Sequence, residues 1–171
     1  MDIPIEIQRS DDEKERFRIA IPIGDMIGNK ISADELQKIS KDYLNFIISC
    51  RKMIEITKKK SKSGDPLLKW ELSNFIYTFI KALHERGYIV TKLAETLARD
   101  LRMSKRHIDY IIEFRETYPK LESVNPKISW DRYKELLDIP NPELREKVEK
   151  MLKQGKMTGR KELRRYKKEN M

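Results

Sequence analysis

From Ala33 to about Lys60, apolar residues recur every three or four positions, and neither proline nor glycine interrupts them. This spacing is typical of an amphipathic α-helix. Ser32 stands three residues before Glu35, the spacing of a capping box, which predicts that the helix begins at Ala33. Its apolar stripe is wide enough to be contacted on more than one side. We interpret the stripe as core packing, with a dimer seam as the alternative.

Shorter helical stretches follow, separated by proline and glycine. Pro66 suits the first turn of the next helix, and Gly87 lies just after its end. We expect Ser129 to cap a later helix, and Thr158 or Gly159 to cap the last one. The spacing predicts helices over residues 66–85, 91–101, 105–118, 130–137, 143–153 and 160–168.

The first part of the chain has a different period. Apolar residues alternate over 3–7 and 17–23, which is typical of strands, and the polar stretch 10–13 predicts a turn. The fold class is therefore mainly α: a multi-helix domain containing a helix-turn-helix, with a short N-terminal β-hairpin and a long first helix. We divide the chain into a hairpin arm (1–31), the long helix and a basic linker (32–64), the helical domain (65–144) and a basic helical tail (145–171).

Basic residues exceed acidic ones, 37 to 28, which gives a net charge of +9. This excess favours nucleic acid as a partner, with an acidic protein or membrane surface second. It is unevenly distributed. The segment 65–144 holds 13 basic and 13 acidic residues, whereas 145–171 holds 11 and 4. The tail and the lysines at 58–62 therefore carry most of the excess.

Residues 94–113 match the pattern of a helix-turn-helix, in which two helices cross closely over a three-residue turn. Ala98 is the small residue that close crossing requires, Met103 fills the turn, and Ser104 can cap the second helix. The apolar positions of the motif are Leu97, Leu101, Ile108 and Ile111. One departure is Arg102, which stands where the turn usually has glycine. A positive φ there costs energy, so either the turn is wider or Arg102 tolerates the strain.

The outward side of this motif holds the residues that we predict to contact DNA. Arg106 suits a bidentate bond to guanine, and Lys105 a phosphate contact. The predicted set is Arg102, Ser104, Lys105, Arg106, Asp109 and Tyr110 in the motif, and Arg160, Lys161, Arg164, Arg165, Lys167 and Lys168 in the tail. The alternative is a helical hairpin with an ordinary charged face.

Several short stretches resemble the helical N-terminal domain of the YhcG-type family, over about residues 66–168. The matching stretches are Trp70-Glu71-Leu72, residues 93–101, 103–108 and 114–119, Ile128-Ser129-Trp130-Asp131-Arg132-Tyr133, residues 136–143 and Arg160-Lys161-Glu162-Leu163. In that family the domain is linked to a PD-(D/E)xK nuclease domain, which this chain does not include. The resemblance therefore implies DNA engagement without cleavage.

No catalytic or metal site is expected. His84 and His107 are the only histidines, and the single cysteine, Cys50, lies in the apolar stripe, where we expect it to be buried. One cysteine excludes an internal disulfide and a Cys-based zinc site. Asp12-Glu13-Lys14 lacks the partner Asp that a nuclease site needs. We therefore expect no enzyme and no cofactor, and we interpret Trp70 and Trp130 as core residues rather than base-stacking platforms.

The sequence thus predicts a non-enzymatic DNA-binding protein, with a role in regulation or in plasmid or chromosome maintenance. Double-stranded DNA is the expected partner, with a homodimer through residues 1–60. The absence of a leader and of a membrane span indicates a cytoplasmic protein, and no small-molecule substrate is evident. Two alternatives stay open: an oligomeric assembly module whose helix-turn-helix is only architectural, and RNA or single-strand binding through the tail.

Overall fold

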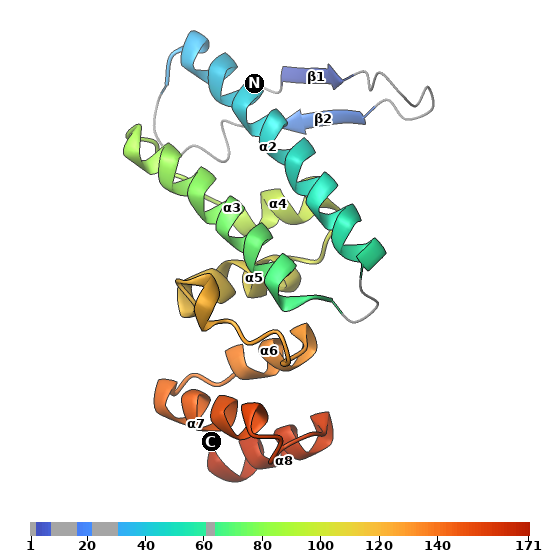
Figure 1. The fold of residues 1–171 in the computed structure, drawn as a ribbon. Coiled ribbons are helices and arrows are strands. Elements are labelled where there is room, and N and C mark those ends of the chain that lie inside the picture. Colours follow the sequence, from blue (N-terminus) through green and yellow to red (C-terminus); the bar gives the residue numbers. More distant parts are fainter. Residues whose placement is uncertain (1–2, 8–16, 22–30, 61–63) are drawn as a thin grey trace. The chain divides into compact units, whose positions relative to one another are not determined.

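The computed structural model describes residues 3–7, 17–21, 31–60 and 64–171, and it is mainly helical (Figure 1). The two longest helices come first, and shorter ones follow. The helices are α2 (Ala33–Lys60), α3 (Pro66–Glu85), α4 (Leu93–Leu101), α5 (Lys105–Thr117), α6 (Trp130–Leu137), α7 (Pro142–Lys153) and α8 (Arg160–Asn170), with a short 3-10 helix, η1, at Leu121–Ser123.

Two strands precede the helices. β1 (Ile3–Ile7) pairs antiparallel with β2 (Phe17–Ile21), and the register sets Ile3 opposite Ile21 and Ile5 opposite Ile19. The turn predicted at 10–13, the glycines at 24 and 28 and residues 61–63 of the predicted basic linker lie outside the described residues.

The start of α2 follows directly from the local sequence. The Ser32 N–H donates to the Glu35 carboxylate over 3.1 Å, and the Glu35 N–H donates to the Ser32 hydroxyl over 3.3 Å. This reciprocal pair is the predicted capping box. The backbone bond outweighs burial and lowers the pKa of Glu35. Cys50 is fully buried, as predicted, and burial raises its pKa to about 12.

Two sequence expectations need correction, and one element was not predicted. α4 begins at Leu93 rather than at residue 91, because Lys92 adopts a left-handed backbone with φ 48° that a helix cannot contain. Ser129 occupies the N-cap position of α6, but its side chain makes no capping hydrogen bond. The 3-10 turn η1 was not predicted, since its three residues carry no periodic apolar signal.

The chain divides into two compact units. The first contains Met1–Cys50 and Thr78–Ile108, and the second contains Arg51–Tyr77 and Asp109–Met171. The boundaries fall inside α2, α3 and α5, so each of these helices contributes residues to both units. Of the predicted segment boundaries, those at 31/32 and 64/65 lie between helices or before the first one, whereas the boundary at 144/145 falls inside α7.

In the first unit, an aromatic cluster joins α2 to the end of α3. Phe46 stacks on Phe79 with ring centres 4.1 Å apart, and Tyr43 lies 6.1 Å from Phe79. Tyr43 and Leu97 of α4 are both fully buried. Since aromatic side chains bury large apolar areas, this cluster supplies much of the unit's packing energy.

In the second unit, the core is a denser aromatic cluster. Phe114 of α5 contacts Tyr118, Trp130 and Tyr133, with ring centres 4.9 to 5.1 Å apart. Trp130 is 3% exposed, so the prediction that it is a core residue is confirmed. Trp70 of α3 is half-buried, and its indole N–H donates to the Tyr118 carbonyl over 2.7 Å.

Gly64 packs against this aromatic cluster, and its backbone has a conformation that favours glycine. Its φ is +80°, and a Cβ there would lie 3.2 Å from Cβ of Trp130. Gly155 has a similar φ of +69° but open space around it. The two glycines thus share a left-handed backbone that would strain any other residue, and they differ in contact with a buried side chain.

We expect Gly64→Ala to destabilise the protein more than Gly155→Ala. Both variants force alanine into a left-handed backbone, at a cost of about 1–2 kcal/mol. Gly64→Ala adds crowding against Trp130, which costs about 1–3 kcal/mol in a packed site. Urea unfolding of both variants measures the difference, and equal losses would contradict the close approach of Gly64 to Trp130.

Candidate nucleic-acid interface

A buried hydrogen bond anchors α4 in the first unit. The Tyr43 hydroxyl on α2 donates to the Asp100 carboxylate over 2.7 Å, and Asp100 is only 5% exposed. The Arg99 guanidinium also donates to Asp100, over 2.7 Å. Burial and the Asp100 charge raise the pKa of Tyr43 well above its usual value, which keeps the phenol protonated as the donor. This pair fixes the C-terminal turn of α4.

Arg102 ends α4 in a left-handed conformation, with φ 53° and ψ 47°. The Met103 N–H returns to the Ala98 carbonyl over 2.9 Å, and the Arg102 N–H returns to the Arg99 carbonyl over 3.3 Å. These are the two backbone bonds of a Schellman helix end, which normally has glycine at this position. Of the two alternatives left open by the sequence, the structure shows the second: Arg102 accepts the positive φ.

Only Arg102, Met103 and Ser104 separate α4 from α5. The Ser104 hydroxyl accepts the His107 N–H over 3.2 Å, so the predicted cap of α5 is confirmed. Lys105 forms an ion pair with Glu95 of α4 over 2.7 Å, with both side chains more than half exposed. The bond from Lys105 lowers the pKa of Glu95. Arg102, Ser104, Lys105 and Arg106 are all exposed at this end of α5.

Of the inward positions of the motif, Leu97, Leu101, Ile108 and Ile111 are all buried, as the pattern predicts. The remaining two predicted contact residues lie farther along α5, in the second unit. Asp109 is exposed. Tyr110 is half-buried, and its hydroxyl donates to the Asp138 carboxylate over 2.7 Å. Tyr110 therefore has a structural partner within the protein.

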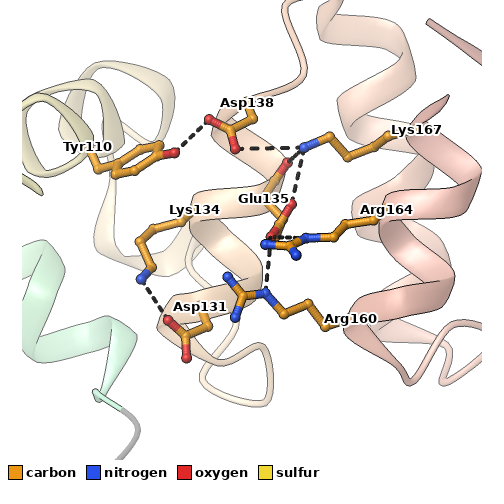
Figure 2. A network of polar contacts seen from close by, with 8 residues as sticks. All are labelled: Tyr110, Asp131, Lys134, Glu135, Asp138, Arg160, Arg164 and Lys167. Carbon is orange, nitrogen blue, oxygen red and sulfur yellow. Dashed lines mark hydrogen bonds and ion pairs between the residues drawn. The ribbon is translucent and has the colours of Figure 1, made fainter. Parts of the chain in front are cut away.

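The basic residues of the tail are not equivalent. Figure 2 shows that Arg160, Arg164 and Lys167 of α8 converge on Glu135 of α6. The shortest distances to the carboxylate are 3.1 Å from Arg160, 2.8 Å from Arg164 and 3.3 Å from Lys167. Lys167 also reaches Asp138 over 3.8 Å, which links the cluster to Tyr110. We call these side chains, with Glu135, Asp138 and Tyr110, the Glu135 network.

Glu135 is 6% exposed, so its charge depends on these partners. Burial raises its pKa, but the hydrogen bonds from Arg160, Arg164 and Lys167 outweigh burial and leave the pKa below its usual value. The carboxylate is therefore ionised and binds α8 to α6. The predicted basic tail is thus a packed helix, further held by Leu163, which is fully buried.

A second row of cations lies on another side of α8. Lys161, Arg165 and Lys168 follow at intervals of four and three residues and are exposed. Arg165 pairs with Glu169 over 3.0 Å, and both side chains are largely exposed. Lys161 and Lys168 form no ion pair with any residue that the structure describes. Lys161 and Arg165 also line a cavity of about 440 Å³ that includes Met151 and Met157.

The residues of the predicted set differ in their partners. Tyr110, Arg160, Arg164 and Lys167 belong to the Glu135 network. The other eight residues lie outside that network and are exposed. The carboxylates Asp100, Glu135 and Asp138 were missed. Their charge looked like an ordinary part of a neutral segment, because the sequence around each of them carries other charged residues.

Within residues 31–60 and 64–171, no group of three or more His, Cys, Asp or Glu side chains is arranged to hold a metal ion. Over the same residues, no helix combines the length and the apolar character that crossing a membrane requires.

Comparison with known proteins gives no relative: no family model, no curated protein and no solved structure matches this chain.

Replacing Glu135 should weaken the second unit in a pH-dependent way. At pH 7 we expect Glu135→Gln to lower the free energy of unfolding by about 1–3 kcal/mol, because charged hydrogen bonds are lost at a buried site. Since the folded pKa of Glu135 lies below the usual 4.5, this contribution is present above pH 4.5 and is lost as the pH falls through the folded value.

Urea unfolding at pH 7 and at decreasing pH tests this expectation, with Glu169→Gln as the control. Glu169 pairs with Arg165 in solvent, so its replacement should cost under about 0.5 kcal/mol. A Glu135→Gln variant as stable as Glu169→Gln at pH 7 would show that the network contributes nothing.

Proposed function

We propose that the chain is a DNA-binding protein and that α4, the 102–104 turn and α5 form a helix-turn-helix whose second helix contacts the duplex. The observation that carries the proposal is the left-handed Arg102 between the two helices. A three-residue turn of this geometry connects the helices of DNA-reading motifs. Here it leaves four polar or basic side chains exposed at the start of α5.

The chemistry of those side chains fits a duplex. Arg106 offers a planar pair of donors for a guanine edge, and Lys105 and Arg102 offer cations for phosphates. The N-terminus of α5 adds a partial positive charge beside Ser104. Lys161, Arg165 and Lys168 on α8 supply further phosphate contacts, and the three cations bonded to Glu135 are left out of the proposed interface. A regulatory or DNA-maintenance role remains part of this proposal.

The resemblance to YhcG-type helical domains stays a prediction, and it supports the same proposal. The second candidate function is assembly, and the strand register favours it: each odd-numbered residue from Ile3 to Ile7 stands opposite an isoleucine or phenylalanine of β2. Two strands alone are marginal in water. Oligomers that persist on dilution, with no affinity for duplex, single-stranded DNA or RNA, would favour assembly over DNA binding.

A substitution at Arg102 should change the stability of the protein and its affinity for a duplex in opposite directions. We expect Arg102→Gly to raise the free energy of unfolding by about 0.5–1 kcal/mol, because glycine takes a positive φ without strain. The same change should weaken binding to a duplex, because a phosphate contact is lost. Thermal unfolding and a duplex titration at about 50 mM salt measure the two effects.

Lys92→Gly is the matched control, since Lys92 also has a positive φ, 48°, and is exposed. It removes the same charge from the other end of α4 and should stabilise by a similar amount. Equal duplex affinity of Arg102→Gly and the unaltered protein would contradict a role for Arg102 in binding.

Arg106 is expected to determine sequence preference. Sites selected from a random DNA pool should share a motif, and Arg106→Ala should weaken binding to that motif by about 1–3 kcal/mol while leaving nonspecific binding less affected. Lys81→Ala, at an exposed lysine paired with Glu85, is the control for loss of charge. A log–log salt slope near zero for the unaltered protein would overturn the proposal.

A further inference from the structure

Lys69 of α3 is buried without a counter-charge. It is 8% exposed, and its Nζ lies 5.9 Å from the centre of the Trp130 ring. Among the described residues, no carboxylate forms an ion pair with it. Burial first, and then the charges of Lys134 and Lys58, lower its pKa. Since a buried cation is costly unless it is paired, this arrangement calls for an anion.

The surroundings of Lys69 favour the binding of an anion. Gly64 lies against Trp130, so the chain entering α3 at Pro66 is close to the first residue of α6. The N–H groups at the start of a helix carry a partial positive charge. At the start of α6, the Ser129 side chain accepts no hydrogen bond from these N–H groups. A helix start without a side-chain cap, beside a buried lysine, has the chemistry of a phosphate site.

Lys134 is the second lysine of the site, and Lys58 adds positive charge to its surroundings. Lys134 lies on α6, and Figure 2 shows it extending on the opposite side of that helix from Lys167. Lys58 belongs to the last turn of α2. Two carboxylates are nearby but already bonded: Asp131 binds Lys134 over 2.7 Å, and Asp65 accepts the Leu67 N–H over 2.9 Å. Asp131 is half exposed, so an anion can displace it from Lys134.

We propose that Lys69 and Lys134, together with the N-terminus of α6, bind a phosphate group. Trp130 is too deeply buried to stack on a base, so the site recognises the phosphate alone. A nucleic-acid backbone and a free phosphorylated compound share this chemistry. The site lies within the second unit and does not rest on the proposed contacts of α5 with DNA.

Titration of the full chain with inorganic pyrophosphate tests the site, by calorimetry and by the shift in melting temperature. We expect saturable binding and a higher melting temperature. Lys69→Met keeps the length and apolar stem of the side chain, so it should fold and lose at least about tenfold in affinity, the equivalent of one charged hydrogen bond. Lys81→Met, at an exposed lysine of the same helix, should bind as the unaltered protein does.

Lys134→Met provides a second variant on a different helix, and it should also weaken pyrophosphate binding. Competition then identifies the source of the phosphate. If a duplex displaces pyrophosphate, the site takes a backbone phosphate, and if both bind together, it takes a free phosphorylated compound. Undetectable binding of pyrophosphate at millimolar concentration, or equal affinity of Lys69→Met and Lys81→Met, would overturn the proposal. Neither result depends on Arg102→Gly or Arg106→Ala.

Discussion

The Glu135 carboxylate is the constraint on which the second unit depends. A buried carboxylate alone would take up a proton or resist burial, because desolvation penalises its charged form. Here three cations of α8 hold it ionised. Lys167 extends the network to Asp138, which accepts the Tyr110 hydroxyl of α5. Three helices are thus bound by one set of charges, in which the buried Glu135 carboxylate is shared by three cations.

The same principle holds α4 in the first unit, where Asp100 is buried and is bonded by Tyr43 and Arg99. Charged residues make up 38% of the chain, and a few of them lie inside the fold. Specific donors surround both the Asp100 and the Glu135 carboxylates, and the elements that supply those donors become fixed. The positions of α4 and α8 are therefore set by directional bonds as well as by apolar packing.

Local features of the fold could be predicted from the sequence, and tertiary ones could not. The bounds of α2, α3 and α6 follow from apolar period, proline and caps, which act over a few residues. Arg160, Arg164 and Lys167, in contrast, lie 25 to 32 residues beyond Glu135. From the charge pattern alone, these three cations are expected to face solvent or phosphate, because their spacing along the chain does not show that Glu135 lies opposite them. The burial of Lys69 could not be predicted either. A single lysine in the sequence is normally expected to extend into solvent, even where its neighbours are apolar.

Arg102 shows how a departure from a local pattern can point to function. The turn between α4 and α5 needs a left-handed residue, and glycine would satisfy that need without strain. Both backbone bonds at this helix end come from main-chain N–H groups, so these two bonds do not themselves involve the arginine side chain. Its presence at φ 53° costs energy in the folded state. Glycine could not supply the exposed guanidinium beside the first turn of α5, and under the proposed function that guanidinium contacts a phosphate.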